Sequence, residues 1–250
     1  MMMIDPLSII SHFYRDEPEL RDLMLKHAFQ VRAKARQILA FSGLELDCDT
    51  ISAGALLHDI GIIRCHAPGI LCNGELPYIA HGVAGAEMLR DYGQAHGVDL
   101  ECFSRICERH TGSGLTEADI RNQDLPLPYQ DFLPETMEEI LICLADKFFS
   151  KSGEMKEKTL SSVRRSMEKF GEASLDRFDQ MCRLFCVDDT LHPVSKDGRH
   201  FQAIPSAFRF LVSLFLYYLK LLFFTSCFKN NQKNRETTYF CLEYVKFQSK

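Results

Sequence analysis

The sequence lacks an excess of positive charge. Its 250 residues carry 29 Lys and Arg against 34 Asp and Glu, which gives a formal net charge of −5. A protein that binds nucleic acid through the phosphate backbone needs a basic surface, so this balance argues against a nucleic-acid partner. Hydrophobic residues make up 46% and charged residues 25% of the chain, proportions typical of a globular protein with a buried core.

The ten cysteines include no C-x-x-C pair, and the N-terminus lacks a basic region followed by an apolar stretch. The sequence therefore gives no indication of a disulfide framework or of an export signal. Several cysteines lie among apolar residues at helical spacing, as Cys143 does between Ile142 and Leu144. We predict buried free thiols and a cytoplasmic protein.

Alternating strand patterns and internal repeats are also absent, and the chain reads as successive helices. From residue 18 to 42 the apolar positions recur at i, i+3 and i+4, which predicts one long helix with a buried face. Gly43 is a natural stop for this helix. Arg32, Lys34 and Arg36 are expected on its solvated face.

The remaining helices follow the same reasoning, with Asp49 as an expected N-cap and a loop predicted over 61–77. The fold class is predicted to be all-α. The other predicted helices cover 49–59, 81–92, 100–110, 116–121, 135–150 and 156–187.

The C-terminal part has a different composition. Residues 203–250 carry seven Lys and Arg and two Glu, so this tail has a charge of +5 and the first 202 residues have −10. We therefore predict one domain over 1–190 and an extension over 191–250, with a hydrophobic helix at about 204–228. Lys220 inside this apolar stretch is costly in a bilayer, so membrane contact is not favoured over a packed helix or an extension not selected for folding.

Metal-capable side chains interrupt apolar or small-residue helices at five places. Burying an imidazole or a carboxylate in such a position is costly unless the group is paired or coordinates a cation. A lone buried histidine is more often a hydrogen-bonded structural residue, but one cation cluster would satisfy all of these side chains together. The residues are His27, the doublet His58-Asp59, His81, His110 and Asp146.

The ordered set H…HD…H…H…D resembles the HD superfamily of metal-dependent phosphohydrolases over roughly residues 18–155, and the superfamily is a helical bundle. The doublet continues as Ile60-Gly61, the HDIG form. The stretches 81–87, 108–116 and 134–139 are similar to an uncharacterised HDIG-domain subgroup found in prokaryotes. One departure is Ile62, because many two-metal relatives have a lysine directly after the HDIG doublet.

The resemblance implies a role for each residue. His27, His58, Asp59 and Asp146 would hold one divalent ion, and His81 and His110 would hold a second ion, with Asp59 bridging the two. Imidazole and carboxylate ligands suit Fe, Mn, Zn, Co or Ni and do not choose among them.

The expected activity is hydrolysis of a phosphate ester, from a nucleotide or another small phosphorylated metabolite, by a water that the two cations activate. No protein nucleophile is then needed, and the chain contains neither a Gly-x-Ser-x-Gly elbow nor a Gly-rich phosphate loop. Two alternatives are open. Some HD relatives use the same ligands for a mixed-valence di-iron oxygenase, and the domain could instead be a non-catalytic nucleotide-binding regulatory module.

Four basic residues near these motifs are candidates for contact with substrate phosphate. Each of them could instead have an ordinary structural role. Arg64 and His66 could be ordinary polar loop residues. Lys147 could pair with a ligating carboxylate, and Arg109 could form a structural ion pair with a neighbouring acid.

Overall fold

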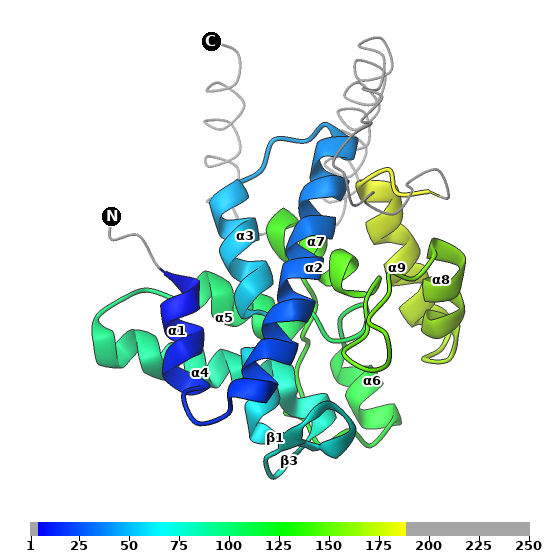
Figure 1. The fold of residues 1–250 in the computed structure, drawn as a ribbon. Coiled ribbons are helices and arrows are strands. Elements are labelled where there is room, and N and C mark those ends of the chain that lie inside the picture. Colours follow the sequence, from blue (N-terminus) through cyan, green and yellow to red (C-terminus); the bar gives the residue numbers. More distant parts are fainter. Residues whose placement is uncertain (1–4, 189–250) are drawn as a thin grey trace, which may run out of the picture. The chain divides into compact units, whose positions relative to one another are not determined.

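The computed structural model describes residues 5–188, so the predicted extension 191–250 with its helix at 204–228 lies outside the described residues. This part is mainly helical, as predicted, and contains nine α-helices (Figure 1). They are α1 (Pro6–Phe13), α2 (Pro18–Ser42), α3 (Cys48–Leu57), α4 (His81–His96), α5 (Glu101–Arg109), α6 (Glu117–Asn122), α7 (Met137–Asp146), α8 (Leu160–Glu168) and α9 (Glu172–Leu184).

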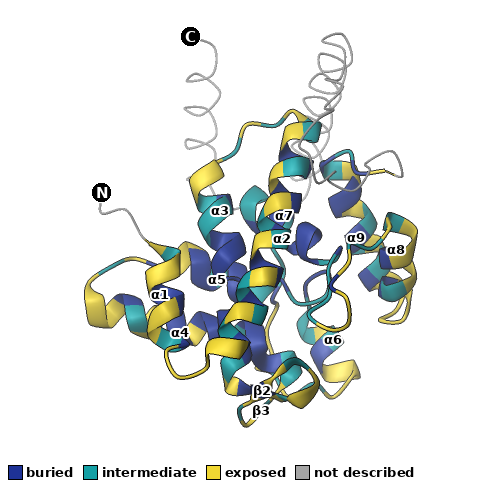
Figure 2. Cartoon of the chain, viewed as in Figure 1, coloured by how far each residue is buried: buried dark blue, intermediate teal, exposed yellow. Residues whose placement is uncertain are grey.

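Helix α2 has the predicted bounds because both of its ends carry local signals. Pro18 occupies the first helical turn, where its missing N–H costs nothing. Gly43 ends the helix in a left-handed conformation with φ 70°, and its N–H donates to the carbonyl of Leu39. Helix α2 packs against α3 and α7, and α4 packs against α5, so buried residues gather where these helices meet (Figures 1 and 2).

Side-chain caps begin several of the shorter helices. Thr116 and Thr136 each cap a helix through a capping box, with Asp119 and Glu139 as the reciprocal partners. Helix α3 is capped by Asp47, which accepts hydrogen bonds from two backbone N–H groups. The helix therefore begins at Cys48, one residue before Asp49, which was the predicted N-cap.

The predicted loop at 61–77 has local structure. It contains a three-stranded sheet in which β1 (Cys65–Ala67) pairs antiparallel with β2 (Cys72–Asn73) and parallel with β3 (Leu76–Pro77). Short 3₁₀ helices flank and interrupt this sheet: η1 (Ile60–Arg64) precedes β1, η2 (Pro68–Ile70) lies between β1 and β2, and η3 (Tyr78–Ala80) leads from β3 to α4. The strands are two or three residues long, so the class remains all-α.

Two helical predictions near the C-terminal end were wrong in extent. The predicted helix 156–187 is divided into α8 and α9 by Gly171, whose φ of 96° is incompatible with a continuous helix. Helix α7 ends at Asp146 rather than near 150, and a segment without regular structure, residues 147–159, leads to α8.

Of the three basic residues predicted on the solvated face of α2, Arg36 is exposed and Arg32 is partly exposed, but the prediction was wrong for Lys34. Its side chain is 1% exposed, and its ammonium lies 2.6 Å from a carboxylate oxygen of Glu157 and 4.5 Å from the centre of the Phe148 ring. Gln30, one turn earlier on α2, donates a hydrogen bond of 2.7 Å to the carbonyl of Met155. Helix α2 therefore holds segment 147–159 in place.

The hydrophobic core extends through most of the described helices. Tyr14, at the end of α1, is fully buried, and its hydroxyl donates a hydrogen bond of 2.8 Å to the carbonyl of Ile60. The eight cysteines among the described residues are free thiols, and five of them are buried as predicted, whereas Cys48 and Cys102 are exposed and Cys186 is partly exposed. Between residues 5 and 188 no helix combines the length and apolar character needed to cross a membrane.

Candidate metal centre

The six predicted side chains come from five separate places in the sequence and converge in the interior. His27 lies on α2, His58 and Asp59 follow α3, and the other three lie at helix ends: His81 begins α4, His110 follows α5 and Asp146 ends α7. All six residues are buried. They form two adjacent groups that share Asp59, and within each group the candidate ligand atoms lie within 4.8 Å of one another.

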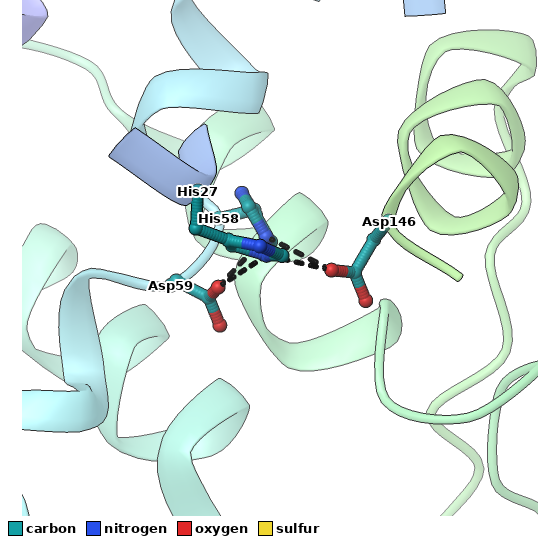
Figure 3. Close-up of side chains that lie close together, drawn as sticks. All are labelled: His27, His58, Asp59 and Asp146. Atoms are coloured by element: carbon teal, nitrogen blue, oxygen red, sulfur yellow. Dashed lines mark hydrogen bonds and ion pairs between the residues drawn. The ribbon is translucent and has the colours of Figure 1, made fainter. Parts of the chain in front are cut away.

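The first group places two imidazoles between two carboxylates (Figure 3). Asp59 Oδ2 lies 3.2 Å from His27 Nε2 and 2.9 Å from His58 Nε2. On the other side, Asp146 Oδ1 lies 2.9 Å from His27 Nε2 and 3.5 Å from His58 Nε2. Two imidazole nitrogens and two carboxylate oxygens, all of them potential metal ligands, therefore face one small volume.

The second group uses the other carboxylate oxygen of Asp59. Asp59 Oδ1 lies 3.5 Å from His81 Nε2 and 3.4 Å from His110 Nε2. One carboxylate thus presents a separate oxygen to each pair of histidines, which is the arrangement that a bridging ligand needs.

Backbone carbonyls fix three of the four imidazoles. The Nδ1 atoms of His58, His81 and His110 lie 2.8, 2.7 and 2.7 Å from carbonyl oxygens three residues earlier. A carbonyl only accepts hydrogen bonds, so each Nδ1 carries a proton and directs Nε2 into the cluster. This orientation is the one in which a neutral imidazole binds a metal.

Several buried atoms of the cluster have close polar neighbours but no hydrogen bond of acceptable geometry. Neither oxygen of Asp59 nor Nε2 of His58 forms a hydrogen bond of acceptable geometry. His81 Nε2 and His110 Nε2 lie 3.0 Å apart, and burial together with the proximity of His110 lowers the pKa of His81 to about 3. Burial also lowers the pKa of His110, so both imidazoles are neutral at neutral pH. Two lone pairs that face each other at this distance repel, and a cation between such donors would remove the repulsion. The residues present therefore fit a pair of divalent cations.

The ionisable side chains of the cluster shift one another's pKa values. Burial alone would raise the pKa of Asp59, but the neighbouring His58 and Lys151 outweigh it and hold that pKa well below its usual range. Asp146 behaves in the same way, mainly because of Lys147. Burial would also lower the pKa of His58, whereas the two carboxylates raise it to about 9. Both carboxylates are thus ionised at neutral pH.

The four predicted phosphate contacts have different environments. The side chain of Lys147 is 8% exposed, and its ammonium lies 2.8 Å from Asp146 Oδ2 and donates a 2.8 Å hydrogen bond to a backbone carbonyl. Arg109 donates to a carbonyl at 2.9 Å and pairs with Glu135 at 2.8 Å. Arg64 pairs with an exposed glutamate, Glu87, and His66 is exposed on β1.

Sequence reasoning missed Lys151, which belongs to segment 147–159. Its ammonium lies 2.6 Å from Asp59 Oδ2, and its side chain is only 11% exposed. It also lies 5.9 Å from the ring centre of Tyr78, which stacks on the imidazole of His81. The only sequence signal was its position shortly after Asp146, because it belongs to none of the recognised motifs.

Comparison with known families agrees with this geometry. A family model described as HD domain matches residues 24–150, just over half of the chain. The chain therefore belongs to the HD domain family, and the five sequence positions that converge in the cluster all lie within the matched residues.

The similar proteins match this chain over only part of its length. An uncharacterized protein of Methanocaldococcus jannaschii is 39% identical over 104 residues, which are 42% of this chain and 51% of that protein. Proteins named tRNA (cytidine(56)-2'-O)-methyltransferase from Picrophilus torridus and Thermoplasma volcanium are 31% and 33% identical over 154 and 135 residues. These matches cover 62% and 54% of this chain but only 38% and 34% of the two relatives. No solved structure matches the chain.

Proposed function

We propose that this protein is a metal-dependent phosphohydrolase with a dinuclear site. The observation that carries the proposal is Asp59, whose two oxygens face two different histidine pairs. His27, His58 and Asp146 would complete the site of one divalent cation, and His81 and His110 that of the other. Two such cations polarise a phosphoryl group and supply a water-derived nucleophile near neutral pH.

The chain's own residues would prepare the site for this chemistry. The backbone carbonyls hold three imidazoles in the ligating orientation, so little reorganisation is needed when a cation binds. Lys147 stabilises the ionised form of Asp146 through their ion pair. We propose a small phosphorylated molecule as substrate, with nucleotides as the first class to screen, and Fe, Mn, Zn, Co and Ni as the metals to compare.

The methyltransferase name of two relatives is not carried over to this chain. The matched stretches make up only 38% and 34% of those two proteins. A metal-binding hydrolase domain within a longer protein is consistent with such a partial match.

Elemental analysis of the purified protein, combined with a phosphate-release screen over nucleotides and sugar phosphates, tests the proposal. We expect two metal equivalents per chain and phosphate release that stops when a chelator removes the metal. A mixed-valence iron signal with oxygen uptake and no phosphate release would instead identify an oxygenase. Tight nucleotide binding without turnover under any divalent ion would identify a regulatory module.

Substitution of the bridging residue sharpens this test. Asp59→Ala should lose both metal equivalents and reduce kcat by more than about 100-fold, because both cations lose a shared ligand. The matched control is Asp91→Ala, which removes an exposed carboxylate from α4. Full activity in the Asp59 variant would refute the dinuclear site.

A further inference from the structure

Most of the basic side chains expected to contact phosphate are occupied elsewhere. Arg64 and Arg109 are held in ion pairs with glutamates, and Arg109 also binds a backbone carbonyl. Lys147 is fixed by a ligating carboxylate and by a second backbone carbonyl. Lys151 differs in the oxygen that its ammonium contacts, because Asp59 Oδ2 is itself the oxygen that faces the imidazoles of the first group. Lys147 instead contacts Asp146 Oδ2, whereas the imidazoles face Asp146 Oδ1.

Lys151 and the first cation would both bind the same carboxylate oxygen, Asp59 Oδ2. Asp59 Oδ2 lies 2.6 Å from Lys151 Nζ and also faces the Nε2 atoms of His27 and His58. A divalent cation bound by those imidazoles would draw on this oxygen and would repel the ammonium beside it. The ammonium would then move off the carboxylate, and its nearest favourable partner would be an anion held by the cations.

The backbone around Lys151 is held while the side chain can move. Gln30 and Lys34 of α2 fix the far end of segment 147–159 through Met155 and Glu157. At the near end, the N–H of Lys158 donates to the carbonyl of Phe148 at 2.8 Å. A lysine has a flexible four-carbon stem that ends in a compact charge with three donors, so it can turn from one oxygen to another without backbone motion.

We propose that Lys151 binds the phosphoryl group of the substrate, and that it leaves Asp59 Oδ2 when the first cation binds there. Its partners would be the non-bridging oxygens of a phosphate monoester or diester. Tyr78 lies beside this ammonium and against His81, and so forms one wall of the phosphate site. The assignment rests on the proposed hydrolase function, but binding of inorganic phosphate tests it without turnover.

The test compares Lys151→Met and Lys151→Arg with the wild-type protein, with Lys156→Met as control. Lys156 lies in the same segment, and its side chain is 80% exposed. Calorimetric titration of Mn²⁺ into the metal-free proteins should show tighter binding of the first cation in Lys151→Met, by about 3- to 10-fold, because a competitor for Asp59 is gone. Lys151→Arg and Lys156→Met should change this affinity less.

Inorganic phosphate is then titrated into the Mn²⁺-loaded proteins. The loss of one charge-assisted contact should weaken phosphate binding by about 10- to 100-fold in Lys151→Met, whereas Lys151→Arg should recover part of it. With the best substrate of the screen, KM should rise more than kcat falls. Circular dichroism of each variant establishes that it is folded.

Unchanged phosphate affinity and unchanged KM in folded Lys151→Met would overturn the assignment and leave the hydrolase proposal standing. Phosphate binding that depends on Lys151, without hydrolysis of any phosphate ester, would support the anion site and overturn the hydrolase proposal.

Discussion

His81 Nε2 and His110 Nε2 face each other 3.0 Å apart, and the Nδ1 atom of each ring lies 2.7 Å from a backbone carbonyl. The carbonyls assign the proton of each neutral imidazole to Nδ1, so both Nε2 atoms present lone pairs. This pair is buried beside Asp59 Oδ1 and completes the second group of candidate ligands.

Removing one member of this histidine pair should empty one metal position only. We expect His81→Ala or His110→Ala to reduce bound metal from two equivalents to one, because the four donors of the first group are untouched. Elemental analysis after desalting measures the ratio. His96→Ala is the control, since that residue is exposed and stacks on Tyr92. Retention of two equivalents in both variants would contradict the assignment.

Gly61 should be intolerant of any side chain. A Cβ atom there would lie 2.1 Å from the carbonyl oxygen of His81 and 2.3 Å from the backbone nitrogen of Gly85, so backbone would have to move. We expect Gly61→Ala to lower the free energy of unfolding by about 2–4 kcal/mol. Chemical denaturation measures this change. Gly69→Ala, where no atom lies within 4 Å, should stay within about 0.5 kcal/mol of wild type.

Lys34 should contribute to stability through its contact with Glu157. Lys34→Met keeps most of the buried aliphatic volume but removes the ammonium, leaving the Glu157 carboxylate without this partner. Because Glu157 is 14% exposed and can still reach water, we expect a loss of about 1–3 kcal/mol in the free energy of unfolding. Lys26→Met, an exposed position on the same helix, should have almost no effect. Equal stabilities for the two variants would contradict this role.

Glu135 should make stability depend on pH in the acid range. Its ion pairs with Arg105 and Arg109 lower its pKa from 4.5 to about 2 in the folded protein. The stabilisation is therefore complete above about pH 4.5 and is lost as the pH falls towards 2. The side chain is 63% exposed, so solvent screening keeps the effect below about 1 kcal/mol.

Urea denaturation of Glu135→Gln and wild type across this range measures the effect. The difference in unfolding free energy should be largest near neutral pH, decrease towards pH 2 and shrink in high salt. A difference that grows on acidification would have the wrong sign for this mechanism.

Local signals made parts of the fold predictable from the sequence. Pro18 and Gly43 mark the ends of α2, and Thr116 caps α6, because these effects act within one helical turn. The division at Gly171 was missed because apolar residues continue on both sides at helical spacing. Only the packing of α8 against α9 requires the chain to reverse there.

The candidate ligands could be predicted because their order and neighbouring residues form a recognisable set. Their orientation could not, since it depends on carbonyls at helix ends whose positions follow from the fold. Lys34 and Lys151 were missed for a similar reason. Their partners, Glu157 and Asp59, are about a hundred residues away in sequence, and no local pattern reports such a pairing.

The hydrogen bond from Tyr14 to the carbonyl of Ile60 has a practical consequence for domain boundaries. Tyr14 precedes the residues matched by the family model, yet its partner directly follows Asp59. A shortened chain that began at residue 24 would lack this buried aromatic ring and would leave the carbonyl of Ile60, the residue after Asp59, without its hydrogen-bond donor. The folded HD domain of this protein thus extends at least one helix upstream of the residues that the family model matches.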